Sequence, residues 1–373
     1  MEKMEIPVRF LTPAFLGDAE QKGAWRSPPF KALLRQWWRV AVAQAYGYNY
    51  EKLREAEGLL FGHAWLKSGG NAWASKSQLR IKLNNWDPGS LINNHWPRKE
   101  FDQVITSKDG KNKVDAEIYL GFGPIIPPSK KLNIPLKTLK NSPAIGPDVA
   151  NIMTLIWDSL PDAQKISIND ALVLCNWFGT VGSRGRNGWG SLCLTTDVFP
   201  SSPKMGHPSL SKVLREWKEC MKEEWPHAIG KDKSGPLIWF TEPLQDWKKV
   251  IGRLAVIKVD VRRTAKRFRF SGLGQIGGIH LLGYPAGKDW ELKEFKSLQT
   301  EPRLASQLRF KAVQDGEMLR GMVFHLPACF PDSLFKKLAP PQQKWLKEHE
   351  LEIWAAVHRT LDTHTMLQKR GGN

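Results

Sequence analysis

Residues 179–190 read Gly179-Thr-Val-Gly182-Ser-Arg-Gly185-Arg-Asn-Gly188-Trp-Gly190, with five glycines in twelve positions. Because glycine has no Cβ, this backbone can turn sharply and bring its N–H groups against another backbone. Successive N–H groups facing one concavity bind anions, and Arg184 and Arg186 add guanidinium charge suited to phosphate oxygens. Trp189 offers a flat face on which an unpaired base can stack. The stretch predicts a loop, Gly182 and Ser183 included, that grips a nucleic-acid strand. The alternative is a flexible hairpin with solvated arginines.

The charge of the whole chain favours the first of these interpretations. Its 373 residues carry a formal net charge of +18 and a sequence pI near 9.7. Such an excess repels itself unless a polyanion neutralises it. A membrane surface is the other polyanion, but no apolar stretch approaches the roughly 20 residues of a spanning helix. The start, Met-Glu-Lys-Met-Glu-Ile-Pro, lacks the apolar core of a signal peptide, and neither end carries a lipidation motif. We expect a cytoplasmic protein that binds nucleic acid and no membrane.

The four cysteines do not indicate a cofactor. Cys175, Cys193, Cys220 and Cys329 show no C-x-x-C spacing, so we expect neither a zinc site nor a disulfide scaffold. Apolar residues make up 41% of the chain, and it holds 17 tryptophans, which argues for folded structure rather than a basic disordered tail. Many of these tryptophans must pack in a core or an interface.

Length and turn-rich segments predict two domains. The first spans 1–205, with an insertion at about 84–115 and the glycine-rich loop at 179–190. A linker with a short helix follows at 206–236, and a second domain spans 237–373. No regular repeat of the solenoid kind is present.

The first domain predicts a strand over 6–10 and then a helix. Ser27 can cap that helix, Pro28 suits its first turn, and Gly47 follows its end. Residues at helical spacing should face the core: Phe30, Leu33, Leu34, Trp37, Ala41 and Ala45. On another face, Lys31, Arg35 and Arg39 form a basic stripe. No acid lies between Lys22 and Arg39, which favours phosphate contact over a solvated face, with Trp38 packing on a base.

Further elements are predicted along both domains. We expect a helix over 50–60, an alternating strand over 75–83, a strand over 116–122, helices over 149–160 and 167–178, and a closing strand over 191–194. The strand over 75–83 would place Lys76, Gln78, Arg80 and Lys82 on one face, a common platform for single strands. In the second domain we expect strands over 256–261, 308–312 and 322–326, a helical tail over 341–367, and a frayed end from Lys369.

The densest positive segment is 253–269, with seven basic residues against one acid, Asp260. A second glycine-rich stretch follows at 272–283. With this segment the set of predicted RNA-contacting residues is complete. They are Lys31, Arg35, Trp38, Arg39, Lys76, Arg80, Gly182, Ser183, Arg184, Arg186, Trp189, Arg262, Arg263, Arg267 and Arg269.

Several motifs occur in the order of a known family. They are Leu11-Thr-Pro-Ala-Phe-Leu-Gly17, Pro28-Pro-Phe-Lys-Ala-Leu-Leu-Arg-Gln-Trp-Trp-Arg39, Leu59-Leu-Phe-Gly62, Ser75-Lys-Ser77, Phe178-Gly-Thr-Val-Gly-Ser-Arg184, Gly188-Trp-Gly-Ser-Leu192 and Arg303-Leu-Ala-Ser-Gln-Leu308. This series resembles the RAMP superfamily, and within it subunit one of the CRISPR type III-B (Cmr) effector complex. The resemblance implies an α+β fold of two ferredoxin-like (RRM-like) domains with insertions. It also implies partners: guide RNA, target RNA and other RAMP subunits, with this chain holding the 3′ region of the guide.

Catalysis is the remaining question, because RAMP relatives include nucleases. Metal-independent RNA cleavage needs a general base and acid, but His63, His280, His358 and His364 show no spacing that demands joint action. Metal-dependent cleavage needs clustered carboxylates, whereas Asp102, Asp109 and Asp115 have no diagnostic spacing; Asp115 is the weak candidate. We expect a non-catalytic RNA-binding subunit without metal. The alternatives are a metal-independent RAMP endoribonuclease that matures guide RNA, and an assembly cap that docks an acidic subunit.

Overall fold

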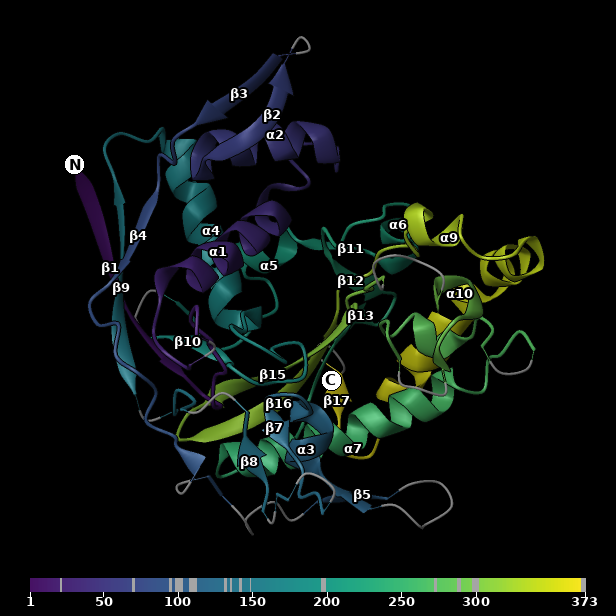
Figure 1. Ribbon diagram of the computed structural model, residues 1–373. Helices are drawn as coiled ribbons and strands as arrows, with labels where there is room; N and C mark the ends of the chain where they lie inside the picture. The colour runs from purple at the N-terminus through teal and green to yellow at the C-terminus, as the bar shows by residue number, and fades with distance from the viewer. Residues whose placement is uncertain are drawn as a thin grey trace.

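Two four-stranded antiparallel sheets organise the mixed α+β fold (Figure 1). The computed structural model describes residues 1–20, 22–68, 71–93, 96–97, 103–106, 113–130, 133–134, 136–140, 143–147, 149–195, 199–271, 274–286, 290–296 and 302–369. The elements up to the glycine-rich loop and just after it are β1 (Glu2–Phe10), α1 (Ser27–Val42), α2 (Tyr50–Phe61), β2 (His63–Ser68), β3 (Asn71–Ser75), β4 (Arg80–Leu83), β5 (Val104–Thr106), β6 (Lys113–Asp115), α3 (Ala116–Gly121), β7 (Ile125–Ile126), β8 (Thr138–Leu139), β9 (Ala150–Trp157), α4 (Asp162–Phe178) and β10 (Leu192–Leu194). The remaining elements are α5 (Pro208–Ser211), β11 (Leu214–Glu216), α6 (Trp217–Cys220), β12 (Ile229–Asp232), β13 (Gly235–Pro236), β14 (Ile238–Phe240), α7 (Trp247–Ala265), the 3-10 helix η2 (Gly278–His280), α8 (Lys293–Lys296), β15 (Leu308–Asp315), β16 (Met318–His325), α9 (Asp332–Phe335), α10 (Pro340–Asp362) and β17 (Gln368–Lys369).

The two large sheets have the same connectivity. The first runs β10-β1-β9-β4 and is built in the chain order β1, α1, β4, β9, α4, β10. The second runs β15-β16-β14-β17 and is built in the order β14, α7, β15, β16, α10, β17. In each case a strand–helix–strand–strand–helix–strand run places its first and third strands in the middle and its second and fourth at the edges. Each half of the chain is therefore one copy of the same antiparallel arrangement.

Alternating side chains explain the first sheet. Along β1, Ile6, Val8 and Phe10 are buried while Glu5 and Pro7 are exposed, because successive side chains point to opposite faces of a strand. The buried face packs against the apolar stripe of α1 and against α4. The sheet thus has one face covered by helices, as its alternation predicts.

The second sheet is covered on both faces. On one face, Phe324 packs against Trp37 of α1 (ring centroids 6.2 Å apart) and Phe178 of α4 (4.9 Å). On the other face, Trp239 and Val323 belong to the core formed with α7 and α10. The first half of the chain therefore supplies one wall of the second half's core.

The segment 206–236 is folded rather than extended. It contains α5, α6 and the small sheet β11-β12-β13, and Leu210, Val213 and Ile229 are buried in the core shared by both halves. The domain boundaries at 205 and 236 that the sequence predicts bracket this segment, and they stay predictions.

Several predicted elements are confirmed. The strand over 6–10 is part of β1, the helix over 50–60 is α2, the helix over 167–178 is the main part of α4, and β10 closes the first sheet. The strands over 308–312 and 322–326 lie in β15 and β16, and α10 accounts for most of the helical tail. Helix α1 also forms, but its N-cap is Arg26 without a side-chain cap, so the cap predicted for Ser27 is wrong. Ala45 lies beyond α1 and is exposed.

For three short apolar runs, the sequence predicts the wrong type of secondary structure. Residues 149–160 are not a helix, because β9 is the third strand of the first sheet. Residues 256–261 are not a strand but lie within α7, and residues 116–122 are not a strand because α3 forms there. The side chains of β9 are mostly buried, so the run has no polar alternation to mark a strand. Periodicity alone does not separate a buried strand from a buried helix.

Two further predictions, the single strand over 75–83 and the frayed end from Lys369, differ from the structure. The strand expected over 75–83 is two strands in different sheets: β3 pairs with β2, and β4 pairs with β9. Between them Leu79 is buried, and its N–H donates to the carbonyl of Leu60. The insertion 84–115 includes the β5–β6 hairpin and the buried Trp96. Lys369 is not frayed, since it lies in β17 and its Nζ is 2.6 Å from Asp232 Oδ2; residues 370–373 lie outside the described part.

Within the described residues, we find no helix that is long and apolar enough to cross a membrane.

Candidate nucleic-acid interface

The glycine-rich loop 179–190 is a fixed structure between the two halves of the molecule. Gly190 N–H donates to the carbonyl of Pro13 (2.9 Å), and Ser183 N–H donates to the carbonyl of Phe15 (3.0 Å). From the second half, Phe310 N–H donates to the carbonyl of Arg186 (3.1 Å). These bonds hold both sides of the loop to neighbouring backbone, which excludes the flexible hairpin.

Glycine is required at particular points of this loop. Gly190 has a φ of +60°, and a Cβ there would lie 1.9 Å from the carbonyl oxygen of Val181. Gly182 has a φ of +97°, and a Cβ there would lie 2.7 Å from the carbonyl oxygen of Phe15. The close backbone approach predicted from the sequence is therefore confirmed, although the partner is the protein's own chain.

Many backbone N–H groups of the loop are used within the fold and not for the predicted anion site. Those of Val181, Ser183, Gly185, Asn187, Gly188 and Gly190 all donate to backbone carbonyls of the protein. The fold satisfies these six groups, so they are not available to an anion, and the side chains of Arg184 and Arg186 are the loop's charged groups in the groove.

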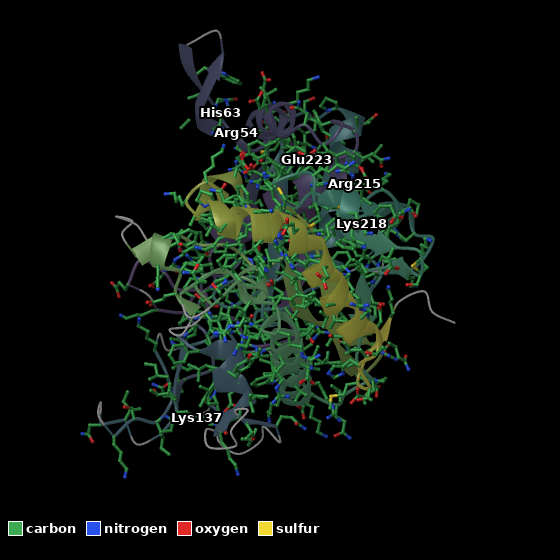
Figure 2. The ribbon with its side chains drawn as sticks, turned by 90° about the vertical axis from the view of Figure 1, so that its right-hand side faces the viewer. Arg54, His63, Lys137, Arg215, Lys218 and Glu223 are labelled. Atoms are coloured by element: carbon green, nitrogen blue, oxygen red, sulfur yellow. The ribbon has the colours of Figure 1, made fainter. Side chains whose placement is uncertain are left out.

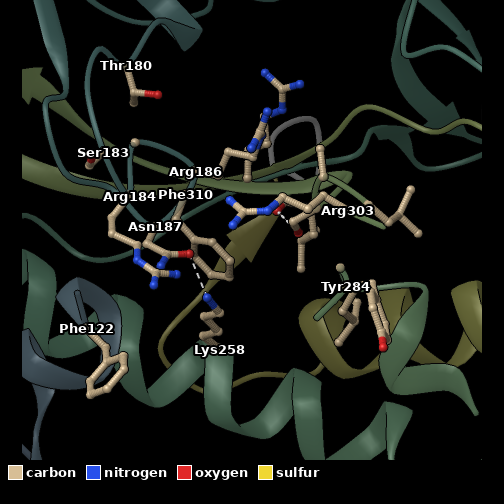
Figure 3. A pocket seen from close by; sticks show the side chains of 18 of the residues that line it. Phe122, Thr180, Ser183, Arg184, Arg186, Asn187, Lys258, Tyr284, Arg303 and Phe310 are labelled. Carbon is tan, nitrogen blue, oxygen red and sulfur yellow. Dashed lines mark hydrogen bonds between the residues drawn. The ribbon is translucent and has the colours of Figure 1, made fainter. Parts of the chain in front are cut away.

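A groove of about 1180 Å³ lies beside the loop (Figure 3). Its walls come from both halves of the chain: α1, α3 with the turn after it, and the loop on one side, and α7, residues 282–286 and residues 303–310 on the other. Six cationic side chains line it: Arg184, Arg186, Lys258, Arg262, Arg303 and Arg309. Among the described lining residues, Glu291 is the single acid. The groove is therefore strongly positive.

Most of this charge is uncompensated by the protein. Within the described residues, the side chains of Arg184, Arg186, Arg303 and Arg309 make no hydrogen bond or ion pair. Arg262 donates from Nη2 to the carbonyl of Ala286 (2.8 Å), which leaves its charge unpaired as well. Figure 3 shows Arg184, Arg303 and Lys258 reaching toward the same space from the loop, from residues 303–310 and from α7.

Burial, and after it the crowding of like charges, lowers pKa values in the groove. Burial, followed by the charges of Arg262 and Arg184, lowers the pKa of Lys258 to about 7. Burial and then Arg186 lower the pKa of Arg309 to about 9. Burial and then Arg303 lower the pKa of Arg184. A site that holds cations at this cost in desolvation and repulsion is typical of function rather than of stability.

The groove also carries aromatic and neutral polar groups. Phe122 projects from the turn after α3 with 59% of its surface exposed, and Tyr284 lies on the opposite wall (Figure 3). Thr180 and Ser183 of the loop and Gln36 of α1 face the same space. An exposed ring at the rim and cations inside are the combination by which proteins bind single-stranded nucleic acids: stacking for bases and charge for phosphates.

Comparison with known proteins finds solved structures that resemble this chain, with low TM-scores and low sequence identity. No protein-family model matches the chain, and no curated protein sequence matches it. Among solved structures, Cmr1 from Pyrococcus furiosus in its apo form has a TM-score of 0.44 at 15% identity, covering 89% of this chain and 90% of that one. A chain of the type III-B Cmr-beta complex bound to cognate target RNA has a TM-score of 0.45 at 14% identity, covering 95% and 99%. A chain of a type IV-B CRISPR complex has a TM-score of 0.32 at 11% identity, covering 56% and 95%.

The basic stripe on α1 is partly neutralised within the fold, since one carboxylate pairs with two of its arginines. Arg35 Nε lies 2.6 Å from Glu57 Oε1, and Arg39 Nε lies 2.5 Å from Glu57 Oε2. Glu57 comes from α2 and is buried. Lys31 donates to Ser77 Oγ (2.9 Å). The argument that this stripe lacks counter-charge is therefore wrong, because the acid comes from the next helix rather than from the stripe's own neighbourhood.

The two predicted stacking tryptophans are core residues. Trp189 is fully buried at 0% exposure, and its ring packs on Phe15 (5.2 Å) and Trp96 (5.9 Å). Trp38 is 3% exposed, and its Nε1 donates to Ser167 Oγ (2.9 Å). Neither ring has a free face for a base, so both predictions are wrong for this structure.

The other predicted contact residues lie apart from the groove. Lys76 is exposed between β3 and β4, and Arg80 is 3.4 Å from Asp158 on the first sheet. Arg263 pairs with Asp260, and Arg269 lies 4.5 Å from the ring centre of Trp290. Arg267 is exposed beyond the end of α7. Of the fifteen residues predicted from the sequence, the structure brings together Gly182, Ser183, Arg184, Arg186 and Arg262. Their contact with RNA stays a prediction.

Sequence reasoning missed three cations of the groove: Lys258, Arg303 and Arg309. Lys258 falls in the run mistaken for a strand, and its place in α7 points it at Asn187 of the loop, whose Oδ1 accepts from Lys258 Nζ at 2.6 Å. Arg303 begins a family-like motif in the sequence, which was a usable signal. Arg309 had none.

The candidate catalytic residues are engaged elsewhere in the fold. His280 is fully buried; its Nδ1 accepts from Gly277 N–H (3.0 Å), and its Nε2–H donates to the carbonyl of Trp290 (2.8 Å). His358 is paired with His325 (2.9 Å) inside the second half, and His364 lies 3.3 Å from Asp260. Asp115 is 3.2 Å from Lys137 Nζ. Asp102 and Asp109 lie outside the described residues. Among the described residues, His280, His358, His364 and Asp115 do not line the groove, and neither does His63, at the base of the β2–β3 hairpin (Figure 2).

Proposed function

We propose that this chain is an RNA-binding subunit of a CRISPR type III-B effector ribonucleoprotein. In this proposal it holds the 3′ region of the guide RNA and helps to engage complementary target RNA, without catalysis of its own. Each half of the chain is a ferredoxin-like domain, since each sheet has the βαββαβ order that defines that fold. The ordered RAMP-like motifs of the sequence support the family, and the groove supports the ligand.

One observation carries the proposal of RNA as ligand. Four arginines of the groove have no partner within the described residues, and the Nε atom of Arg309 is buried without a hydrogen bond. A small anion would satisfy one or two of these groups. A single strand brings a phosphate for each of several, and guanidinium groups hold phosphate oxygens in pairs. A strand of linked phosphates is therefore the ligand that fits the whole set.

The chemistry of the groove suits a protein that must accept any guide. Contacts to phosphate fix position without reading sequence. The exposed ring of Phe122 can stack on any base, because every base has a π face. A reader of specific bases would instead present fixed hydrogen-bonding groups, and Asn187 is already occupied by Lys258 and by the carbonyl of Leu120.

The test is binding of labelled single-stranded RNA by the purified chain across a salt series. If most of the six groove cations contact phosphates, log K should fall with log salt with a slope of up to about −4, at about 0.7 for each phosphate. The variant R184A/R186A should weaken binding by about tenfold or more, since a hydrogen bond to a charged group is worth about 1.5–3 kcal/mol. It should also flatten the slope by about 1.4, twice the value for one phosphate.

The matched control is R54A/R359A, which removes the same charge from exposed positions on α2 and α10 that do not line the groove. Figure 2 shows Arg54 near the β2–β3 hairpin, at the opposite end of the molecule from Lys137. This variant should keep the slope of the unmodified chain. Equal losses in the two variants would mean diffuse charge attraction, not a groove. Discrete cleavage products on an RNA gel would mean a nuclease.

A further inference from the structure

Lys311 is a lysine with no exposed surface, and its side chain crosses from one half of the molecule to the other. It lies on β15 of the second sheet with 0% exposure. Alternation along the strand puts it on the same face as Val313, the face that packs against the first half of the chain. Its ammonium group therefore ends inside the interface between the halves.

The acceptors of this amine stand at both ends of the glycine-rich loop. Lys311 Nζ donates to the carbonyl of Asn176 at 2.5 Å and to that of Leu192 at 2.8 Å, with the carbonyl of Cys175 at 3.5 Å. Cys175 and Asn176 belong to the last turn of α4, where carbonyls carry partial negative charge; the carbonyl of Cys175 also accepts from Gly179 N–H. Leu192 begins β10. One amine thus hydrogen-bonds to the backbone just before the loop starts and just after it ends.

Neighbouring residues of β15 hold the middle of the loop. Phe310 N–H donates to the carbonyl of Arg186, and Ala312 N–H donates to Ser191 Oγ (2.8 Å). Ser191 Oγ in turn donates to the carbonyl of Gly188 (2.8 Å). Since β15 is an edge strand of its sheet, these N–H groups face outward and the loop covers the edge. Three consecutive residues of β15 therefore act as a template for the loop.

We propose that Lys311 is a positioning residue for the RNA site: it fixes the ends of loop 179–190 so that Arg184 and Arg186 point into the groove. This inference rests on the function proposed above. A buried amine is costly to desolvate, and an apolar side chain of similar length often serves stability as well or better. Burial also lowers the pKa of Lys311 to about 7, which shows how far from water the group is held. An apolar side chain at this position could not hydrogen-bond to both ends of the loop.

The experiment compares K311M with Q342M in the full chain. Met keeps the length of the lysine stem and removes the donors. Gln342 is also buried (1% exposed) and makes two hydrogen bonds, to Ile276 N–H and to Glu294, but it does not touch the loop. We expect K311M to weaken RNA binding about as much as R184A/R186A and to flatten the salt slope equally. Q342M should lower the melting temperature yet leave affinity and slope unchanged.

A cycle with the arginines separates positioning from stability. If Lys311 acts through Arg184 and Arg186, the triple variant K311M/R184A/R186A should bind no more weakly than R184A/R186A. Additive losses, or a K311M variant with normal affinity, would overturn the inference. Should K311M fail to fold, K311Q, whose side chain is shorter and uncharged, replaces it in the same cycle, and the same outcomes decide.

Hydrogen exchange keeps this inference distinct from the proposed function. In K311M the amides of Val181, Gly190 and Leu192 should exchange faster than in Q342M, while those of β1 facing β9 stay protected. Faster exchange supports the positioning role even if the unmodified chain binds no RNA, in which case the proposed function alone fails. Unchanged exchange at these amides overturns the role of Lys311 whatever the RNA binding.

Discussion

At the scale of single residues, Lys258 makes the groove sensitive to pH. Its pKa is lowered to about 7 by burial and by Arg262 and Arg184, and its Nζ donates to Asn187 Oδ1. A phosphate placed in the groove raises that pKa, because an opposite charge favours the ammonium form. RNA binding should then take up a proton near neutral pH, so affinity falls as the pH rises from 6 to 8.

The check on this expectation is RNA affinity measured at constant salt over that pH range. In K258R, whose guanidinium stays charged throughout, affinity should be flat and high. In K258M it should be flat and low. A K258M variant that keeps the pH dependence would show that another group titrates.

Part of the groove could be predicted from the sequence, because charge and glycine content are properties of short stretches of chain. Arg184 and Arg186 stand beside glycines in the sequence, and the groove contains both. Glu57 was not recognised as the partner of Arg35 and Arg39, because the two elements that carry them meet only in the fold. Trp189 matched a stacking platform in composition, but a flat ring says nothing about which of its faces is free.

At the scale of elements, the conformation of the glycine-rich loop is a matter of stability as well as binding. Gly190 combines a φ of +60° with a Cβ position 1.9 Å from the Val181 carbonyl. G190A should therefore lose about 1–3 kcal/mol for strain and more for the displaced carbonyl. The measurement is urea unfolding against G316A, because Gly316 has a φ of +59° with no atom within 4 Å of its Cβ position. Equal losses in both variants would mean that the loop yields to the added methyl group.

Elements were predictable where their pattern was long or amphipathic. Helices α1 and α4 and strand β1 carry clear periodicity, and all three form. The misassigned runs lie where burial removes the pattern, as in β9, or where a few alternating residues lie within a longer helix, as at 256–261 in α7. The polar side of a helix or strand is what marks its period, and a fully packed element has little of it.

At the scale of the whole molecule, a buried histidine pair makes stability depend on acid. His358 and His325 share a hydrogen bond next to Trp354. Burial lowers the pKa of His358 to about 3, and that of His325 falls well below its usual 6.5, first through burial and then through His358. The unfolded chain therefore binds more protons than the folded one between about pH 6.5 and pH 3. Stability should be full above pH 6.5 and fall as the pH is lowered through that window.

Urea unfolding at several pH values measures this effect. The variant H358F should reduce the proton uptake on unfolding by about one, and so flatten the dependence on pH. A steep loss that persists in H358F would assign the acid sensitivity to other groups.

The shared core has a consequence for how RNA enters the groove. Phe324 of the second sheet packs on Trp37 and Phe178 of the first half, so the halves cannot swing apart without exposing that core to water. A strand must then enter a channel that is already formed. Association would be a single step whose rate is set by diffusion and by attraction of the strand to the basic walls, and it would slow as salt is added. Dissociation, rather than any opening of the protein, would set how long the strand stays.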